Sequence, residues 1–464
     1  MKNFNWTLKE IERALSIKLK KNSFISNILI NSALVKKDDL FIPIKGQNYD
    51  GHQFIEDAIN NGASYSLATK EKYKKFKLDR VKEKIILVKN INSSLYNLAK
   101  FARKRISGKI LGITGSVGKT SIKEAIIFIL KEKIKIQSNK GNYNNLIGMP
   151  LSLVNFRKNI DLGILELGMN RIGEIKKLSH ISRPDIALIS KISDAHIGNF
   201  KSIKDIAISK SQIFSGMNTS GIAILNHSDP YSVLLKERAK LDGIKNFIFF
   251  GKSKECDVKL LDVQSISNDK FKIFVDAAGK KIIFNLNSLG KHWIENSLAI
   301  ISFFLSINED LVLFSERISN FKAIKGRGEI LKILFNKKKI SIIDDSYNSS
   351  PESLDKSISF LSHYGYKKRK ICVLGDMKEL GKFSKKSHLN FKKKIEDNKI
   401  FKVYTVGTEM KNLHNVLSAS IEKFHTESLN ELYSDLKTTI NSNDVILFKG
   451  SRTMQLDKII NKFK

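Results

Sequence analysis

The feature that most constrains the fold of this chain is a glycine-rich loop between a strand pattern and a helix pattern. An apolar run over 110–113 leads into the loop, and a helical pattern over 121–130 follows it. Glycines let backbone N–H groups turn inward at a helix start, where they bind phosphate oxygens, and a following lysine and hydroxyl reach the β/γ-phosphates and Mg²⁺. Because both flanks are present, we favour a phosphate-binding loop over a chance turn. Its residues are Thr114, Gly115, Ser116, Val117, Gly118, Lys119 and Thr120.

The loop is shorter than the general phosphate-binding loop. The general motif has a glycine five residues before the glycine that precedes the lysine, and Ile113 occupies that position here. The first glycine of the loop is instead Gly115, which gives the spacing G-x-x-G-K-T.

Alternating apolar runs and helical segments predict an α/β fold of three domains. The length of 464 residues suggests about three units, and we predict domains over 1–105, 106–322 and 323–464. The first domain is expected to be small and mixed α/β, with strands at 24–30, 40–44 and 85–88 and helices at 54–61 and 93–105.

The second and third domains each show the alternation of strands and helices that is typical of a parallel, doubly wound sheet. The expected strands of the second domain are 110–113, 134–137, 162–166, 185–189, 221–225 and 246–250, and those of the third are 340–343, 370–374, 402–406 and 444–448. Segments 257–266 and 271–284 are expected to form a hairpin or extra antiparallel strands, and 288–304 a helix.

The strong positive charge does not identify a partner by itself. Lys+Arg 81 and Asp+Glu 46 give a net charge of +35, which can indicate binding to nucleic acid or to an anionic membrane. The lysines are spread along the chain, so we favour a diffuse compositional bias and predict no nucleic-acid partner. No apolar run reaches the roughly 18–20 residues that a membrane span needs.

The N-terminus and the cysteines predict a cytoplasmic protein. Residues 1–15 show neither an apolar h-region nor a small-residue cleavage site, so we predict no signal peptide. Cys256 and Cys372 lie far apart and lack metal-ligand spacing, which fits a reducing compartment.

Two residues after predicted strands are candidate metal ligands. Glu166 ends the strand at 162–166, beside the strand that carries the loop, where a carboxylate could bind Mg²⁺. A helix cap or a solvated carboxylate is an equally good interpretation. His196 follows the strand at 185–189, and a lone histidine in such a place is more often structural. Spacing alone would not select Lys210.

Polar loops elsewhere could bind a substrate or a nucleotide. Asn142, Asn144 and Asn145 lie in a run of turn formers that suits hydrogen bonding to a polar substrate, although a plain turn is equally possible. In the third domain Arg327 could bind a phosphate, and Asp345 follows a strand, where an acidic residue can bind a ribose hydroxyl. The loops that contain Asn348 and Arg452 end at the same predicted sheet edge.

Taken together, these motifs resemble the Mur ligase family, the ATP-dependent ligases that build the peptide stem of peptidoglycan. The resemblance covers nearly the whole chain. It rests on the short loop 114–120, on Glu166-Leu167-Gly168-Met169 and on Gly326-Arg327. Four further motifs resemble the branch of the family that adds a dipeptide, and the stretch 375–381, G-D-M-K-E-L-G, is the most discriminating. The others are 142–150, 344–351 and 449–452.

The resemblance implies a fold, a reaction and roles for the candidate residues. It implies a UDP-sugar-binding N-terminal domain, a central ATP-binding domain and a C-terminal Rossmann-like domain. The implied enzyme joins D-Ala-D-Ala to the terminal carboxylate of UDP-MurNAc-tripeptide through an acyl phosphate. It would use ATP and two Mg²⁺ ions and would act as a monomer without a nucleic-acid partner. The implied metal ligands are Thr120, Glu166, His196 and a carbamylated Lys210, with Lys119, His196 and Lys210 catalytic.

Contacts to nucleotide and substrate are implied in the same way. ATP would contact the loop 114–120 together with Asn296, Arg327 and Asp345. The substrates would contact Ser32, Lys45, Asp50, His52, Asn142, Asn144, Asn145, Asn348 and Arg452.

The chain departs from the family pattern at three places. The usual D-S-R of the first domain reads Asn31-Ser32-Ala33, the H-N-x-x-N start of a helix has Trp293 as its second residue, and the glutamate two residues after Lys210 is Gln212. These departures affect the expected contacts to uridine, the helix start and the surroundings of Lys210, respectively.

Three alternatives remain open from the sequence. A sibling ligase or a folylpolyglutamate synthase would add a single amino acid, and the motif at 375–381 argues against both. A P-loop kinase would phosphorylate its acceptor and need no amine. A basic nucleic-acid-binding NTPase would show steeply salt-dependent binding to DNA or RNA.

Overall fold

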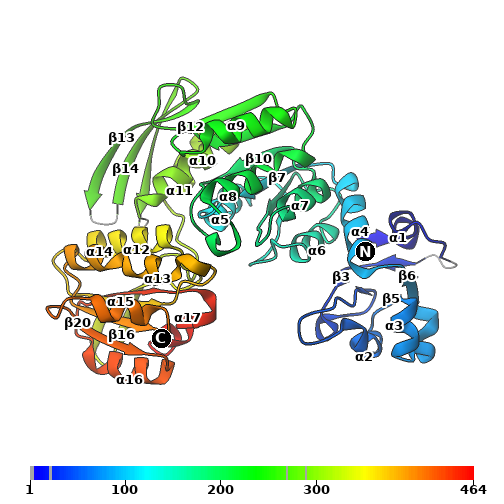
Figure 1. Cartoon of the computed structure of the whole chain (residues 1–464). Helices are drawn as coiled ribbons and strands as arrows, with labels where there is room; N and C mark the ends of the chain where they lie inside the picture. The colour runs from blue at the N-terminus through cyan, green and yellow to red at the C-terminus, as the bar shows by residue number, and fades with distance from the viewer. Residues whose placement is uncertain (1–4, 20–22, 268–269, 288–289) are drawn as a thin grey trace.

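The computed structural model describes residues 5–19, 23–267, 270–287 and 290–464. Three larger sheets follow one another along the chain, and a two-stranded sheet lies near the N-terminus. Figure 1 shows the N-terminal part on one side of the central sheet and the C-terminal part below its antiparallel end. The expected α/β class is confirmed, whereas the exact domain limits stay a prediction.

The N-terminal sheet is parallel, in the order β3-β4-β5-β6. Its strands are β3 (Ile28–Leu29), β4 (Leu40–Phe41), β5 (Tyr65–Thr69) and β6 (Ile85–Val88). The helices around it are α1 (Leu8–Leu15), α2 (Ile55–Asn60), α3 (Lys70–Lys75) and α4 (Ile91–Arg105). The single strand expected at 24–30 is wrong, and the strand expected at 40–44 is shorter.

The expected strand at 24–30 is divided in two at Asn27. Its first part, β2 (Phe24–Ile25), pairs with β1 (Trp6–Thr7), and the second part is β3. The backbone and side-chain amides of Asn27 both donate to Asp39 Oδ1 at 3.0 Å. These bonds replace a continuous strand ladder at this point and redirect the chain.

The central sheet has the order β15-β14-β13-β12-β11-β10-β7-β9-β8. Its parallel strands are β7 (Lys109–Thr114), β8 (Ile136–Ser138), β9 (Leu162–Glu166), β10 (Ile186–Ile189), β11 (Ile222–Asn226) and β12 (Asn246–Gly251). β13 (Val258–Ser267) joins this array in parallel and then pairs antiparallel with β14 (Lys270–Ala277). β14 in turn pairs antiparallel with β15 (Lys280–Asn287).

The antiparallel strands expected over 257–266 and 271–284 are confirmed, and the second segment covers β14 and most of β15. Ala278 and Gly279 have φ values of 52° and 84°, which is the left-handed conformation that tight hairpin turns need. Gly279 N donates to Asp276 Oδ1 at 2.8 Å and closes the turn. The helix expected at 288–304 is α10 (His292–Ser306), and its expected first two residues lie outside the described residues.

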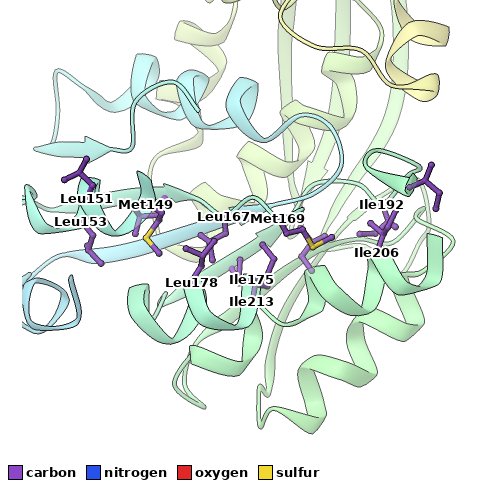
Figure 2. Packing of buried hydrophobic residues seen from close by; sticks show 14 of the residues in the cluster. Met149, Leu151, Leu153, Leu167, Met169, Ile175, Leu178, Ile192, Ile206 and Ile213 are labelled. Carbon is purple, nitrogen blue, oxygen red and sulfur yellow. The ribbon is translucent and has the colours of Figure 1, made fainter. Parts of the chain in front are cut away.

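Helices cover both faces of the central sheet, as a doubly wound fold requires. Strand residues Leu111 and Ile113 pack with α5 (Lys119–Leu130), α10 and α11 (Leu311–Ile318) in one core. A second core contains residues of the other helices shown in Figure 2: α6 (Gly148–Val154), α7 (Glu174–Ser182) and α8 (Ile203–Ser211). α9 (Ser232–Leu241) follows β11.

The C-terminal sheet has the order β16-β17-β21-β18-β19-β20. The four expected strands are β17 (Lys338–Asp345), β18 (Lys370–Gly375), β19 (Lys402–Val406) and β21 (Val445–Lys449). The sequence analysis missed both edge strands, β16 (Glu329–Phe335) and β20 (Glu422–Thr426), which are mostly half-buried. Edge strands carry fewer fully buried side chains, so their apolar pattern is weaker.

Helices surround this sheet too, and they are α12 (Pro351–Tyr364), α13 (Ser384–Leu389), α14 (Phe391–Asp397), α15 (Met410–Val416), α16 (Leu429–Thr439) and α17 (Leu456–Asn461). Across the described ranges of the chain, no helix combines the length and apolar character needed to cross a membrane.

Candidate active site

The glycine loop connects β7 to α5 as the sequence predicts, and two glycines make its shape possible. Gly115 and Gly118 have φ values of 146° and 89°, which side chains rarely adopt. A Cβ on Gly118 would also lie 2.8 Å from Asn296 Oδ1. The loop and α10 therefore approach so closely that Asn296, an expected ATP contact, lies directly against the loop.

Hydrogen bonds to neighbouring strands hold the loop in place. Thr114 Oγ1 donates to Leu167 O at 2.8 Å, and Ser116 N donates to Lys191 O at 2.7 Å. Ser190 Oγ donates to Val117 O at 2.6 Å. These bonds come from the segments after β9 and β10, so the shape of the loop is fixed by the sheet before any phosphate binds.

Two lysines meet at one carbonyl of the loop. Lys119 Nζ and Lys210 Nζ donate to Gly115 O at 2.6 and 2.9 Å. Burial lowers the pKa of Lys119 to about 8, against the opposing effect of Glu166. Burial and the charge of Lys119 lower the pKa of Lys210 well below its ordinary value. The two amino groups therefore meet at one point of the loop, where Lys119 in its charged form attracts anions.

Glu166 lies at the end of β9 and is enclosed by polar partners. Thr120 Oγ1 donates to its Oε2 at 3.1 Å, and Lys123 Nζ lies 3.1 Å from its Oε1. The side chain of Asn139 is paired with the backbone N–H and C=O of Glu166, at 2.9 and 3.1 Å. The carboxylate is thus a fixed, buried group directly behind the hydroxyl of Thr120.

Lys123 is a component of the site that the sequence analysis missed. It is fully buried on α5 and donates to Asn139 O at 2.6 Å. A signal was present, because Lys123 lies four residues after Lys119 and therefore on the same face of the helix. A lysine inside an otherwise apolar helical run (Ile122, Ala125, Ile126) indicates a buried partner.

His196 lies in the central domain and contacts a residue of the C-terminal domain. It adopts a left-handed φ of 65°, and its Nδ1 lies directly against Oε2 of Glu379 in the 375–381 motif. The contact with His196 holds the pKa of Glu379 below its usual range, against burial. The sequence analysis proposed His196 as a metal ligand and did not anticipate this partner.

One pocket of about 300 Å³ joins the two domains. From the central domain it is lined by loop residues 116–120, Glu166, His196, Lys210 and Asn296. From the C-terminal domain it is lined by Arg327, Asp345 and Asn348. The guanidinium of Arg327 lies over the ring of Tyr347, 4.0 Å from its centroid. Residues distant in sequence thus share one cavity.

Lys449 is a cation of the pocket that the sequence analysis did not single out, and substrate contact by Arg452 stays a prediction. The Nζ of Lys449 lies 2.8 Å from Asp345 Oδ2 and donates to Asn348 O at 2.8 Å. Lys449 lines the pocket. Arg452 instead pairs with Asp457 at 3.0 Å, with 63% of its side chain exposed, and it does not line this pocket among the described residues.

The amide-rich loop contributes one residue to the pocket and two outside it. Asn144 lines the pocket. Asn145 Oδ1 accepts from Gly148 N at 2.8 Å and so stabilises the start of α6. Asn142 is exposed and, within the described chain, does not line the pocket.

An ionic cluster across the domain boundary was also missed from the sequence. Glu352 on α12 pairs with Lys191 of the central domain at 2.8 Å and with Lys356 at 2.9 Å. Burial opposes ionisation of Glu352, but the two lysines hold its pKa below the usual value. Burial also lowers the pKa of His292, in the pocket wall, to about 4.

A second, more open cavity of about 1140 Å³ lies in the N-terminal domain. Lys45, Asp50 and His52 line it. Burial raises the pKa of Asp50, but hydrogen bonds from His52 and Lys72 outweigh that effect and lower it to about 2. Among the described residues Ser32 does not line this cavity; its carbonyl accepts from Asn61 Nδ2 at 3.1 Å.

The interdomain pocket fits a magnesium–nucleotide complex better than a protein-only metal cage. Within the described parts of the chain, no group of three or more His, Cys, Asp or Glu side chains could hold a metal. Mg²⁺ commonly uses one or two carboxylates together with substrate phosphates and waters. A buried Glu166 beside the hydroxyl of Thr120, at the foot of a phosphate-binding loop, supplies that kind of donor set.

Comparison with known proteins agrees with this arrangement. Models of the "Mur ligase family, catalytic domain", the "Mur ligase middle domain" and the "Mur ligase, glutamate ligase domain" match residues 24–103, 113–303 and 326–452. A UDP-N-acetylmuramoyl-tripeptide–D-alanyl-D-alanine ligase of Rickettsia prowazekii is 32% identical over 99% of this chain and 100% of its own length. The ligase of the same name from Bacillus subtilis is 31% identical over 95% and 93%.

Solved structures show the same fold. MurF from Acinetobacter baumannii has a TM-score of 0.86 at 24% identity, over 99% of this chain and 98% of its own. The MurF ligase of Thermotoga maritima, solved in complex with ADP, has a TM-score of 0.80 at 29% identity over 94% and 96%. The matched domains, the full-length relatives and the loop geometry lead to one conclusion: the chain belongs to the Mur ligase family.

Proposed function

We propose that this protein is an ATP-dependent ligase that joins D-Ala-D-Ala to the terminal carboxylate of UDP-MurNAc-tripeptide in peptidoglycan precursor synthesis. The observation that carries the proposal is the full-length relationship to the Rickettsia prowazekii ligase, with 32% identity over 99% of this chain. The interdomain pocket supports it, because it places an anion-binding loop opposite polar groups of a second domain.

In the first step the tripeptide carboxylate attacks the γ-phosphate of ATP, giving an acyl phosphate and ADP. Catalysis of phosphoryl transfer is mainly positioning and charge stabilisation. Lys119 is released from Gly115 O and neutralises the phosphate oxygens, while the N–H groups of the loop bind them. Arg327 and Asn296 bind the nucleotide from either side of the pocket, and Asp345 is a candidate partner of the ribose.

Thr120, Glu166 and His196 are the residues that would hold Mg²⁺. When bound, Mg²⁺ neutralises charge on the phosphates and aligns them. Lys210 would join this set as a carbamate, because reaction with CO₂ converts its amine into an oxygen-bearing anion. Burial and the charge of Lys119 lower the pKa of Lys210, which favours the unprotonated amine that this reaction needs.

In the second step the amine of D-Ala-D-Ala attacks the acyl carbon, the amide bond forms and phosphate leaves. We assign the dipeptide to the C-terminal side of the pocket, near Asn348, and the UDP-sugar to the N-terminal cavity at Lys45, Asp50 and His52. Asn144 lies in the pocket wall, where it could bind the peptide end of the tripeptide. We further propose that the enzyme acts in the cytoplasm, as a monomer and without a nucleic-acid partner.

Acceptor selectivity tests the proposal. The purified protein is given ATP, Mg²⁺ and UDP-MurNAc-tripeptide with either D-Ala-D-Ala or single amino acids, and phosphate release is measured. We expect release to depend on the dipeptide. Release with a single amino acid would indicate a sibling ligase, release without any amine would favour a kinase or NTPase, and stimulation by DNA or RNA would refute the proposal.

A further inference from the structure

The motif at 375–381 contacts the central domain at its tip, and this contact suggests a role for it. Gly198 N donates to Glu379 O at 2.8 Å, and Glu379 pairs with His196 Nδ1. Both His196 and Glu379 have left-handed φ values of 65°. Such backbone conformations cost free energy for residues other than glycine and persist where the surroundings impose them.

The base of the motif is fixed within the C-terminal domain. Asp376 Oδ1 accepts from Met410 N at 2.8 Å, and Met377 N donates to His388 Nε2 at 3.1 Å. Lys378 N donates to Ser451 Oγ at 2.8 Å, and Leu380 is 2% exposed. The tip of the motif therefore moves with the whole domain and not as an independent loop.

Two glycines let the domains approach closely enough for this contact. A Cβ on Gly198 would lie 2.5 Å from Gly381 N, and its three nearest atoms all belong to the C-terminal domain. A Cβ on Gly381 would lie 2.9 Å from Gly198 Cα. A side chain at Gly198 would therefore push directly against the C-terminal domain.

We propose that Glu379 is a positioning residue that orients His196 for metal binding and makes this orientation depend on contact between the two domains. The Glu379 carboxylate lies against Nδ1, where it is placed to accept the N–H of a neutral ring. Such a bond would fix the ring and its tautomer, so that Nε2 carries the lone pair for a metal. Carboxylates commonly orient metal-binding histidines in this way. Here the carboxylate and the histidine belong to different domains, and the inference rests on the metal site of the proposed function.

This arrangement couples the binding of the metal–nucleotide complex to domain contact. Separation of the domains removes Glu379 from His196 and frees the ring to rotate. By linkage, a metal–nucleotide complex that binds the oriented His196 more tightly also favours the contact. The motif at 375–381 would then act on the metal through His196 and would not itself provide a metal ligand.

Metal binding to the full-length protein tests the proposal without an activity readout. Mn²⁺ binding is measured by electron paramagnetic resonance in the presence of saturating ADP, for Glu379→Ala, Glu379→Gln and Gly198→Ala. We expect Glu379→Ala to weaken Mn²⁺ binding about 10- to 100-fold. Glu379→Gln should lie between this variant and the unsubstituted protein, because its amide oxygen still accepts a hydrogen bond.

Gly198→Ala leaves both side chains in place and separates the backbones, so it should weaken Mn²⁺ binding in the same direction. The control is Glu427→Gln, an exposed carboxylate of the same domain, which should leave binding unchanged. Metal-free ADP binding and the thermal unfolding midpoint, followed for every variant, identify general damage to the fold.

Unchanged Mn²⁺ binding in Glu379→Ala would overturn the proposal, whatever Gly198→Ala does. A ligase assay on the unsubstituted protein separates this outcome from failure of the proposed function. If its phosphate release does not depend on the dipeptide, the proposed ligase reaction is refuted. The comparison of Mn²⁺ binding would still report on the role of Glu379.

Discussion

The interdomain pocket and the N-terminal cavity both present charged groups to an expected phosphate-bearing substrate, but they hold those groups differently. At the pocket wall Glu166 is almost fully buried and pairs with Lys123, which is buried behind the lining. In the cavity Lys45 is exposed, and Asp50 pairs with Lys72 near solvent. Buried charges respond strongly to the loss of a partner, whereas solvent screens exposed ones. Substitutions in the pocket should therefore have much larger effects.

The largest effect is expected for Lys123→Met, which leaves the buried Glu166 without its closest cation. Removal of one partner of a buried ion pair costs about 3–5 kcal/mol, and we expect a loss of this size in the free energy of unfolding, measured by urea denaturation without ligand. The double variant Lys123→Met/Glu166→Leu should recover most of it. If Lys123→Met lowers the free energy of unfolding no more than Lys131→Met, at an exposed lysine, the contrast between buried and exposed charges is wrong.

Lys119→Ala should reduce catalysis strongly. The side chain is the cation nearest the expected γ-phosphate, and removal of one preorganised charge-stabilising donor costs about 10²- to 10³-fold in rate. Dipeptide-dependent phosphate release measures this loss, with Lys131→Ala, at the exposed C-cap of α5, as the control. Near-normal acyl-phosphate formation by Lys119→Ala would contradict the assignment.

Nucleotide affinity should fall with rising pH. With a pKa of about 8, Lys119 is charged below pH 8 and neutral above it, so above pH 8 it must take up a proton to pair with a phosphate. ADP affinity should be about tenfold lower at pH 9 than at pH 7. Isothermal titration calorimetry measures both affinity and proton uptake. Lys119→Met should remove this pH dependence of ADP affinity and the proton uptake on binding. An equal pH dependence in the variant and the unsubstituted protein would show that Lys119 is not its cause.

The same pKa implies a stability change of definite sign. Burial lowers the folded pKa of Lys119 below the ordinary value of 10.5, so the unfolded chain binds more protons between about pH 8 and 10.5. The penalty for burying the charged form is therefore present at lower pH and is relieved as pH rises through this window.

The smallest effect is expected in the N-terminal cavity. Lys45→Ala should raise KM for UDP-MurNAc-tripeptide only about two- to fivefold, since an exposed charge contributes little after screening. We expect kcat to stay unchanged, because the residue lies far from the phosphate-binding loop in another domain. A large fall in kcat would show that the cavity is coupled to the pocket more directly than the comparison assumes.

The sequence was most informative where chemistry depends on local spacing. The glycine loop, its flanking strand and helix, and the alternation that gives parallel sheets all follow from neighbouring residues. It was less informative where strands are short or lie at an edge, as at β16, β20 and the division near Asn27. There the apolar signal is weak, and hydrogen bonds to distant residues decide where a strand ends.

The candidate site shows the same division. Sequence alone determined the loop 114–120, the carboxylate Glu166 at a strand end and the motif at 375–381. Only the tertiary structure decided that Lys123 pairs with Glu166, that Lys449 and not Arg452 enters the pocket, and that Glu379 reaches His196. The physical reason is that local spacing sets which face of a helix or which end of a strand a side chain occupies. Its partner is set by how separate elements and domains pack.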